Sequence, residues 1–239
     1  MSGGICAVLL AAGQGSRYRA LAGAGEDKLL ARCRGRDGSE RAVLEHALLA
    51  LRANLERVLL VTRPGNGGAI ALGETHGCEV LILDSAGMGE SIAAAVSHAE
   101  DCAGWLIALG DMPFILPSTV GRVLRALEEH PLVVPTWQGR YGHPVGFGRG
   151  CRAELAALDG DRGAKRLLRE GGCTSWRSRI AACSGMSIRR RRSASPMRCR
   201  IEPAVQCRGC CSSCGTQFRR RTGQSGVPEW PAQLETIVC

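Results

Sequence analysis

An uninterrupted apolar run at residues 4–10 leads directly into a glycine- and serine-rich loop at residues 11–16. A short apolar run without polar alternation is typical of a strand that is buried on both faces of a sheet. Glycines directly after such a strand let backbone N–H groups approach phosphate oxygens, and Arg17 and Lys28 add positive charge nearby. The pattern predicts a buried strand and a phosphate-binding loop; the alternative is a glycine turn that only connects strand to helix.

Segments of strand and helix character alternate along the chain as far as residue 135. Further strands are expected at residues 56–62, 79–84, 105–109 and 132–135, and helices at residues 42–51, 67–76, 89–101 and 117–130. This alternation predicts an α/β fold with a Rossmann-like, doubly wound and mainly parallel sheet. The rhythm then changes to a loop or hairpin at residues 137–147 and to two short helical stretches at residues 151–158 and 164–170.

The composition of the chain changes near residue 172. The net charge of +9 belongs entirely to residues 173–239, which hold 12 arginines, 3 glutamates and no aspartate or lysine, whereas residues 1–172 are neutral. Eight of the 13 cysteines also lie in this tail. Because few large aliphatic side chains remain there to form a core, we expect one α/β domain at residues 1–172 and a disordered, low-order tail rich in arginine and cysteine at residues 173–239.

Two features of the tail look like binding motifs but do not predict a site. Four cysteines fall within residues 207–214, whereas structural zinc sites normally separate their two cysteine pairs by about a dozen residues or more. The four-arginine run at residues 189–192 can attract phosphates only without sequence specificity. We therefore expect neither zinc nor a specific nucleic-acid partner.

No stretch of the sequence approaches the ~20 apolar residues that span a bilayer, and the N-terminus lacks the basic region of a signal peptide. We therefore expect a cytoplasmic protein that does not bind a membrane.

Three further motifs fall in expected loops. Asp111 lies in Leu-Gly-Asp-Met-Pro at the carboxyl end of a strand, where ligands collect in open α/β sheets and where a carboxylate can hold Mg²⁺ against nucleotide phosphates. Ser91 lies in Gly-Glu-Ser and can either cap a helix or contact a ligand. His143 lies in Gly-His-Pro-Val, beside a rigid proline. Taken alone, such an aspartate can also cap a turn, and a loop histidine is usually only solvated.

The spacing of the glycine loop fits neither G-x-x-x-x-G-K-[ST] nor G-x-G-x-x-G. Six motifs in order, LAAGxGSR, DKLL, GES, LGDMP, GHPV and GDRGAKRLL, closely resemble the nucleotidyltransferases of the molybdenum-cofactor family, the MobA-like NTP transferases, in particular their cytidylyltransferase branch. The resemblance covers residues 4–170. It implies a Rossmann-type domain in which the terminal phosphate of molybdopterin attacks the α-phosphate of an NTP and releases pyrophosphate.

The resemblance also implies roles for individual residues. Arg17 and Lys28 would contact the triphosphate and Asp111 would hold Mg²⁺, so these three are the expected catalytic residues. The nucleotide side is expected to be formed by Leu10, Ala11, Ala12, Gly13, Gly89, Glu90 and Ser91, and the acceptor side by His143, Pro144, Asp161 and Gly163. Phosphoryl-type transfer needs positioning and charge neutralisation, so no Ser or Cys nucleophile is required.

The resemblance implies substrates and partners as well. Ala12, in LAAG rather than LAGG, favours CTP over GTP. The expected partners are CTP or GTP, a molybdopterin-type cofactor, and a molybdoenzyme or its chaperone.

The sequence departs from the family pattern in two places. Residues 20–25 form a small-residue insertion between Arg17 and Lys28. More seriously, the family ends in an Asp-x-Asp-Thr-Pro element that supplies a second carboxylate to the metal, and the tail contains no aspartate. One choice of codons for residues 184–190 reads Arg-Asp-Val-Asp-Thr-Pro when it is shifted by two bases, so we hypothesise that the tail is a frameshift product, which the DNA sequence would test. We expect intact nucleotide binding and impaired catalysis.

Two alternative functions stay open. A sugar- or polyol-phosphate nucleotidyltransferase shares the LAAG loop but does not usually carry the GHPV and GDRGAKRLL pair. A non-catalytic nucleotide- or cofactor-binding protein for molybdoenzyme maturation would fit the missing second carboxylate. Release of pyrophosphate from an NTP would distinguish an enzyme from such a binding protein.

Overall fold

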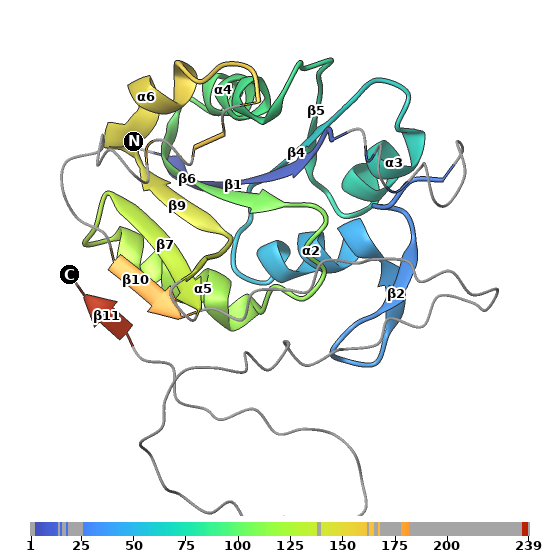
Figure 1. Ribbon diagram of the computed structural model, residues 1–239, viewed down its shortest axis with the longest axis horizontal. Helices are drawn as coiled ribbons and strands as arrows, with labels where there is room; N and C mark the ends of the chain where they lie inside the picture. The colour runs from blue at the N-terminus through green and yellow to red at the C-terminus, as the bar shows by residue number, and fades with distance from the viewer. Residues whose placement is uncertain are drawn as a thin grey trace, which may run out of the picture. The chain divides into compact units, whose positions relative to one another are not determined.

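The N-terminal apolar run forms β1, an interior strand of a large mixed sheet (Figure 1). The structure is a computed structural model of the chain, and it describes residues 3–13, 15, 18, 26–137, 140–161, 163–164, 167, 178–181 and 236–238. The strands of the sheet are β1 (Gly3–Ala11), β4 (Val58–Thr62), β5 (Glu79–Ile82), β6 (Cys102–Leu109), β7 (Leu132–Trp137), β8 (Arg140–Tyr141), β9 (Val145–Gly148), β10 (Ser178–Ala181) and β11 (Thr236–Val238).

The sheet has the strand order β11-β10-β7-β9-β6-β1-β4-β5, with β8 paired to β7. β1 lies between β4 and β6 and is parallel to both, and β5 continues the parallel part beyond β4. β9 is antiparallel to β6 and to β7, so β7 runs in the same direction as β6. The predicted α/β architecture with a mainly parallel sheet is confirmed.

Helices cover both faces of the sheet, as expected for a doubly wound fold. They are α2 (Val43–Arg52), α3 (Gly67–Thr75), α4 (Met88–His98), α5 (Pro117–Leu127), the 3₁₀ turn η1 (Arg149–Cys151) and α6 (Arg152–Ala156). Buried side chains of α2, α3 and α5 pack on one face, and those of α4 and α6 pack on the other.

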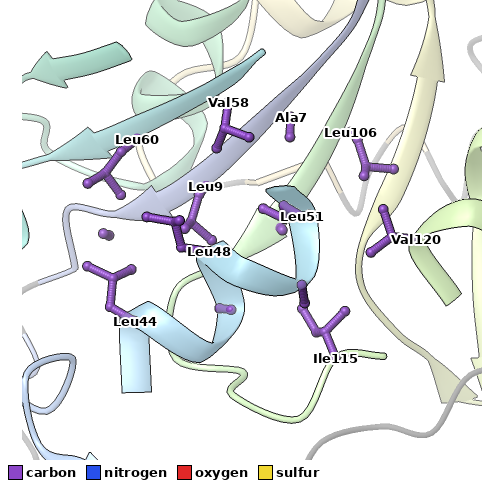
Figure 2. Close-up of a cluster of buried hydrophobic side chains, with 14 of the residues drawn as sticks. Ala7, Leu9, Leu44, Leu48, Leu51, Val58, Leu60, Leu106, Ile115 and Val120 are labelled. Atoms are coloured by element: carbon purple, nitrogen blue, oxygen red, sulfur yellow. The ribbon is translucent and has the colours of Figure 1, made fainter. Parts of the chain in front are cut away.

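The side chains of β1 divide between the two cores because successive residues of a strand point to opposite faces. Ala7 and Leu9 join the core formed with α2, where Leu48 is also fully buried (Figure 2). Cys6 and Val8 join the core beneath α4. Burial on both faces explains why the run has no polar alternation.

The predicted elements before residue 135 are all present, with ends that shift by a few residues. In this part of the chain two strands were not predicted, β2 (Arg32–Arg34) and β3 (Glu40–Ala42), which form a separate antiparallel hairpin. Their residues are mainly arginine and glutamate, so they give no apolar signal. β9 falls in the segment predicted as a loop or hairpin, and the structure places it inside the sheet.

The predicted tail is described only at β10 and β11. β10 is parallel to β7, and β11 is antiparallel to β10, so the structure shows regular strands there where the sequence predicts none. The remainder of residues 173–239, including both cysteine pairs and the arginine run, lies outside the described residues. In the part of the chain that is described, no helix is long and apolar enough to cross a membrane.

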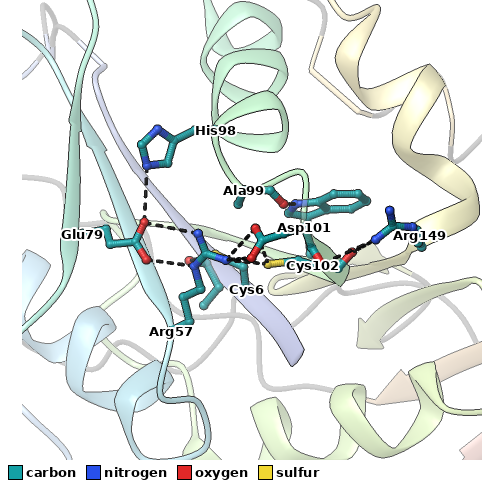
Figure 3. A network of polar contacts seen from close by, with 10 residues as sticks. Cys6, Arg57, Glu79, His98, Ala99, Asp101, Cys102 and Arg149 are labelled. Atoms are coloured by element: carbon teal, nitrogen blue, oxygen red, sulfur yellow. Dashed lines mark hydrogen bonds and ion pairs between the residues drawn. The ribbon is translucent and has the colours of Figure 1, made fainter. Parts of the chain in front are cut away.

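A network of charged side chains joins the strands at the edge of the sheet where β4, β5 and β6 begin (Figure 3). Nε of Arg57 lies 2.8 Å from Oε1 of Glu79, and its Nη1 lies 2.8 Å from Oδ1 of Asp101. His98 approaches the second oxygen of Glu79 at 3.3 Å. Hydrogen bonds from Arg57 hold the pKa of the Glu79 and Asp101 carboxyl groups below their ordinary values.

We predict that Arg57→Met reduces the loss of stability in acid. A carboxyl group whose pKa is depressed in the folded state stabilises the protein above its unfolded pKa, about 4, and this contribution is lost as the pH falls through the folded pKa. The free energy of urea unfolding, measured from pH 7 down to pH 3, should therefore fall less steeply in Arg57→Met than in the wild type. Arg152→Met is the control, because it removes a surface ion pair to Glu100. Equal slopes for Arg57→Met and the wild type would contradict this role.

Candidate functional site

The carboxyl ends of β1 and β6 lie side by side, and a backbone hydrogen bond links the end of β1 to the segment that follows β6. Leu10 pairs with Leu109 in the sheet, and the N–H of Gly110 donates to the Leu10 carbonyl at 2.9 Å. A Cβ on Gly110 would lie 2.9 Å from Cδ1 of Leu44 and 3.1 Å from the Leu10 carbonyl oxygen, so glycine permits this approach. The loop that carries Asp111 is therefore held against the start of the glycine loop.

The glycine loop presents open backbone at this edge of the sheet. Gly13 and Gly15 are exposed, and a Cβ on either would meet no atom within 4 Å. Gly15 has a φ of 59°, in the left-handed region that favours glycine. Ala12 is half-buried just before them. The loop geometry fits the approach of a phosphate, while the expected contact of Arg17 falls on a residue outside the described part.

Lys28 and Asp111, which the sequence assigns to different roles in one expected site, lie together at this edge. Nζ of Lys28 lies 2.8 Å from Oδ2 of Asp111, although the two residues are 83 positions apart. The Lys28 side chain is 19% exposed, whereas that of Asp111 is 45% exposed. The ammonium group is thus held in place beside a carboxylate that faces solvent.

Asp111 can supply one ligand to a divalent metal but, within the described part of the chain, not a complete metal site. Among the described residues, no three His, Cys, Asp or Glu side chains gather into a metal-binding group. Mg²⁺ commonly uses one or two protein carboxylates and completes its shell with water and substrate phosphates. Asp111 offers one such carboxylate, and a cation, the Lys28 ammonium, already lies against one of its oxygens.

The Gly-Glu-Ser motif and the turn at residues 159–163 lie against each other, although they are distant in sequence. The N–H of Gly89 donates to the carbonyl of Gly160 at 2.8 Å. A Cβ on Gly87 would lie 2.3 Å from the same oxygen, and a Cβ on Gly89 would lie 2.5 Å from the Asp159 carbonyl oxygen. Only glycine fits between helix and turn, so the structure brings two predicted parts of the site together. The sequence motifs did not indicate Gly87 as a residue of this contact, although a second glycine two residues before Gly89 is itself a sign of close backbone approach.

The prediction that Ser91 caps the helix is wrong. Gly87 is the N-cap residue, so Ser91 does not cap the helix; its hydroxyl is buried and pairs with that of Ser85 at 2.8 Å. Glu90 accepts a hydrogen bond from the N–H of Ala86 at 2.8 Å, as acidic residues in the first turn often do. Both polar side chains therefore stabilise the helix start in this structure.

The two remaining acceptor-side motifs are also described. The N–H of Gly163 donates to the Asp161 carbonyl at 3.0 Å, and Asp161 itself is exposed. His143 is half-buried between β8 and β9, with Nδ1 3.4 Å from the carbonyl oxygen of Ile107 in β6. The bond from His143 to Pro144 is cis. His143 is thus attached to the strand that leads to Asp111.

The buried thiol of Cys6 offers no alternative chemistry. Burial raises the pKa of the Cys6 thiol to about 12, so the group stays protonated near neutral pH. Cys6 lies in the core beneath α4, so this thiol is not a nucleophile of the site.

We predict that Gly89→Ala destabilises the fold by about 1–3 kcal/mol, because the new Cβ would overlap the backbone of the 159–163 turn. Gly67→Ala is the matched control, since Gly67 also lies in the first turn of a helix and its Cβ would meet no atom within 4 Å. The control should be neutral or should stabilise the protein by up to about 1 kcal/mol. Urea unfolding of both variants checks this, and equal stability of the two would contradict the close packing.

Comparison with known proteins agrees with the fold and with these loops. The family of MobA-like NTP transferase domains matches residues 7–177. The chain is 25% identical to Rv0371c from Mycobacterium tuberculosis, whose crystal structure matches with a TM-score of 0.65 over 77% of this chain and 92% of that chain. A second structure of Rv0371c is a complex with manganese, with 24% identity and a TM-score of 0.63 over 80% of this chain and 95% of that chain.

Curated proteins that match by sequence include the following two. The purine catabolism protein PucB of Bacillus subtilis is 26% identical over 178 residues, covering 69% of this chain and 80% of PucB. The bifunctional protein GlmU of Gloeobacter violaceus is 26% identical over 190 residues, covering 77% of this chain. The match spans only 38% of the length of GlmU.

The fold is therefore that of an α/β nucleotidyltransferase domain. Within this class, the chain belongs to the family of MobA-like NTP transferase domains.

Proposed function

We propose that the protein is a divalent-metal-dependent nucleotidyltransferase that moves CMP, or less readily GMP, from an NTP onto a molybdopterin-type cofactor. The observation that carries the proposal is the Lys28–Asp111 pair at 2.8 Å beside the open glycine loop. Family membership supports a nucleoside triphosphate as one substrate. The choice of CTP rests on Ala12, and the choice of acceptor rests on the resemblance of the GHPV and GDRGAKRLL motifs.

In the proposed reaction, a terminal phosphate oxygen of the acceptor attacks the α-phosphorus of the NTP. The bond from that phosphorus to the bridging oxygen of the β-phosphate breaks, and pyrophosphate leaves with the electron pair. Bound Mg²⁺ would neutralise charge on the phosphate oxygens. The backbone N–H groups of Gly13 and Gly15 and the Lys28 ammonium would orient the triphosphate, since positioning and electrostatics supply most of the catalysis in such transfers.

In the proposed site, Asp111 holds the metal and His143 and Pro144 flank the acceptor. Asp161 and Gly163 also lie on the acceptor side, and their turn packs against Gly89 at the start of α4. This contact supports an acceptor that binds next to the nucleotide. Magnesium is the proposed metal, and the manganese in the Rv0371c complex supports a divalent ion of this size.

A second candidate function is binding without catalysis, in the maturation of a molybdoenzyme. The observation that favours it is that, among the described residues, no group of three or more potential metal ligands gathers around Asp111. Purified protein with Mg²⁺, molybdopterin and either CTP or GTP should release pyrophosphate if the first proposal is correct. Tight cofactor binding without release would favour the second, and release only with sugar or polyol phosphates would identify another acceptor class.

We predict that Asp111→Asn lowers the rate of pyrophosphate release by about 100-fold or more, because an electrostatic contact to the reacting phosphates is lost. Binding of the NTP should weaken much less, since Lys28 and the glycine loop remain. Turnover assays and equilibrium titration with CTP measure the two effects separately. Asp101→Asn, at the opposite edge of the sheet, is the control and should retain activity. Equal losses of binding and turnover in Asp111→Asn would argue against the metal role.

A further inference from the structure

The residue before Lys28 makes contacts that the proposed reaction does not use. The carboxylate of Asp27 is 20% exposed. Its Oδ1 accepts a hydrogen bond from the N–H of Leu29 at 2.9 Å, and its Oδ2 accepts one from Nδ2 of Asn66 at 3.1 Å. Nη2 of Arg63 lies 3.4 Å from the same Oδ2. A half-exposed loop is thus fixed to the turn between β4 and α3 by an aspartate that does not itself contact Asp111.

The partners of Asp27 are firmly placed. Asn66 is 5% exposed and is the N-cap of α3, where its Oδ1 accepts the N–H of Ala69 at 3.3 Å. This bond leaves the amide nitrogen of Asn66 facing Asp27. Just past it, a Cβ on Gly68 would lie 2.4 Å from Cδ1 of Leu30, so the Lys28 loop packs closely on α3.

The other side of the Lys28 loop is fixed to α2. The Leu29 carbonyl accepts the N–H of Leu44 at 2.9 Å, and the Ala31 carbonyl accepts the N–H of Val43 at 3.0 Å. These two N–H groups belong to the first turn of α2, whose N-cap residue Ala42 makes no side-chain cap. Lys28 therefore lies between two anchors, one on α2 and one, through Asp27, on α3.

We infer that Asp27 is a positioning residue that holds the Lys28 ammonium in place against Asp111. The inference rests on the proposed function for the importance of Lys28 to the triphosphate. Asp27 acts through the backbone of the loop, because its contacts to Asn66 and Arg63 fix that backbone to the turn before α3 and so set the direction in which the Lys28 side chain leaves the loop. A flexible four-carbon side chain gains precision only if its backbone is fixed.

The accessibility of the Lys28 ammonium can be measured without a ligand, because the sequence contains few lysines. The chain contains two lysines, Lys28 and Lys165. The rate at which an acylating reagent modifies Lys28, followed by peptide mass spectrometry, therefore reports how firmly its ammonium is held.

Asp27→Asn is the first test variant. The asparagine has the same shape, and its amide oxygen can still accept the Leu29 N–H. The variant removes the negative charge that faces Arg63, and it places an NH₂ group against the NH₂ group of Asn66, where no hydrogen bond can form. We expect Lys28 to be acylated several-fold faster and the affinity for CTP with Mg²⁺ to fall about tenfold, the cost of a lost charge-assisted contact. In a Lys28→Met background, Asp27→Asn should produce no further loss of affinity.

Two further variants protect the test against simple misfolding. Asn66→Asp keeps the cap of α3 but places a carboxylate against Asp27, and it should act in the same direction as Asp27→Asn. The double variant Asp27→Asn with Asn66→Asp exchanges donor and acceptor, and it should restore part of the protection of Lys28. Asp37→Asn is the matched control, because Asp37 makes the same kind of contacts, to the N–H of Ser39 and to Arg41, in the β2–β3 hairpin.

The outcomes separate the inference from the proposed function. Unchanged acylation of Lys28 in a folded Asp27→Asn variant would overturn the inference, as would an equal loss of CTP affinity in the Lys28→Met background. If the wild type binds neither CTP nor GTP while the acylation rates behave as described, the proposed function fails and the positioning role of Asp27 stands.

Discussion

The burial of β1 on both faces is the constraint on which the rest of this structure depends. An apolar strand of this kind needs a neighbouring strand at each edge and a helical layer on each face, and β4, β6, α2 and α4 meet that need. Because β1 and β6 are adjacent and parallel, the loops after them open at the same edge of the sheet. The bond from Gly110 to Leu10 then fixes the distance between the glycine loop and Asp111. The position of the candidate site is thus a consequence of strand packing.

At that edge, separate parts of the chain are joined by a few short contacts. Lys28 bonds to Asp111 across the site, Asp27 fixes the Lys28 loop to α3, and Gly89 fits against the turn that carries Asp161. Each contact links a loop to a helix start or a strand end, which are the rigid parts of the fold. In the proposed reaction, this arrangement would supply positioning and charge neutralisation.

The sequence predicted the parallel part of the fold, because apolar runs and strand-end motifs are local signals. It assigned Lys28 to the triphosphate and Asp111 to the metal of one expected site, but it did not predict the ion pair between them. It did not predict β2 and β3, whose arginine-rich residues pair without an apolar face. It read Ser91 as a candidate cap, whereas the cap is Gly87, a position set by contact with a turn far along the chain. The contacts of Asp27 were missed for the same reason, since its partners Arg63 and Asn66 lie in a distant turn. The roles of Arg17 and of most of the tail stay predictions.

The central claim is that Asp111 is the metal carboxylate of a nucleotide site and that Lys28 is its partner until the substrate arrives. Titration of Mn²⁺ followed by electron paramagnetic resonance tests this most directly, with and without CTP. The account predicts weak Mn²⁺ binding to the free wild type, tighter binding with CTP, and binding to free Lys28→Met that is tighter than to the free wild type by about tenfold, because a competing cation has been removed. Mn²⁺ affinity that is the same in Asp111→Asn as in the wild type, or unchanged by Lys28→Met, would contradict it.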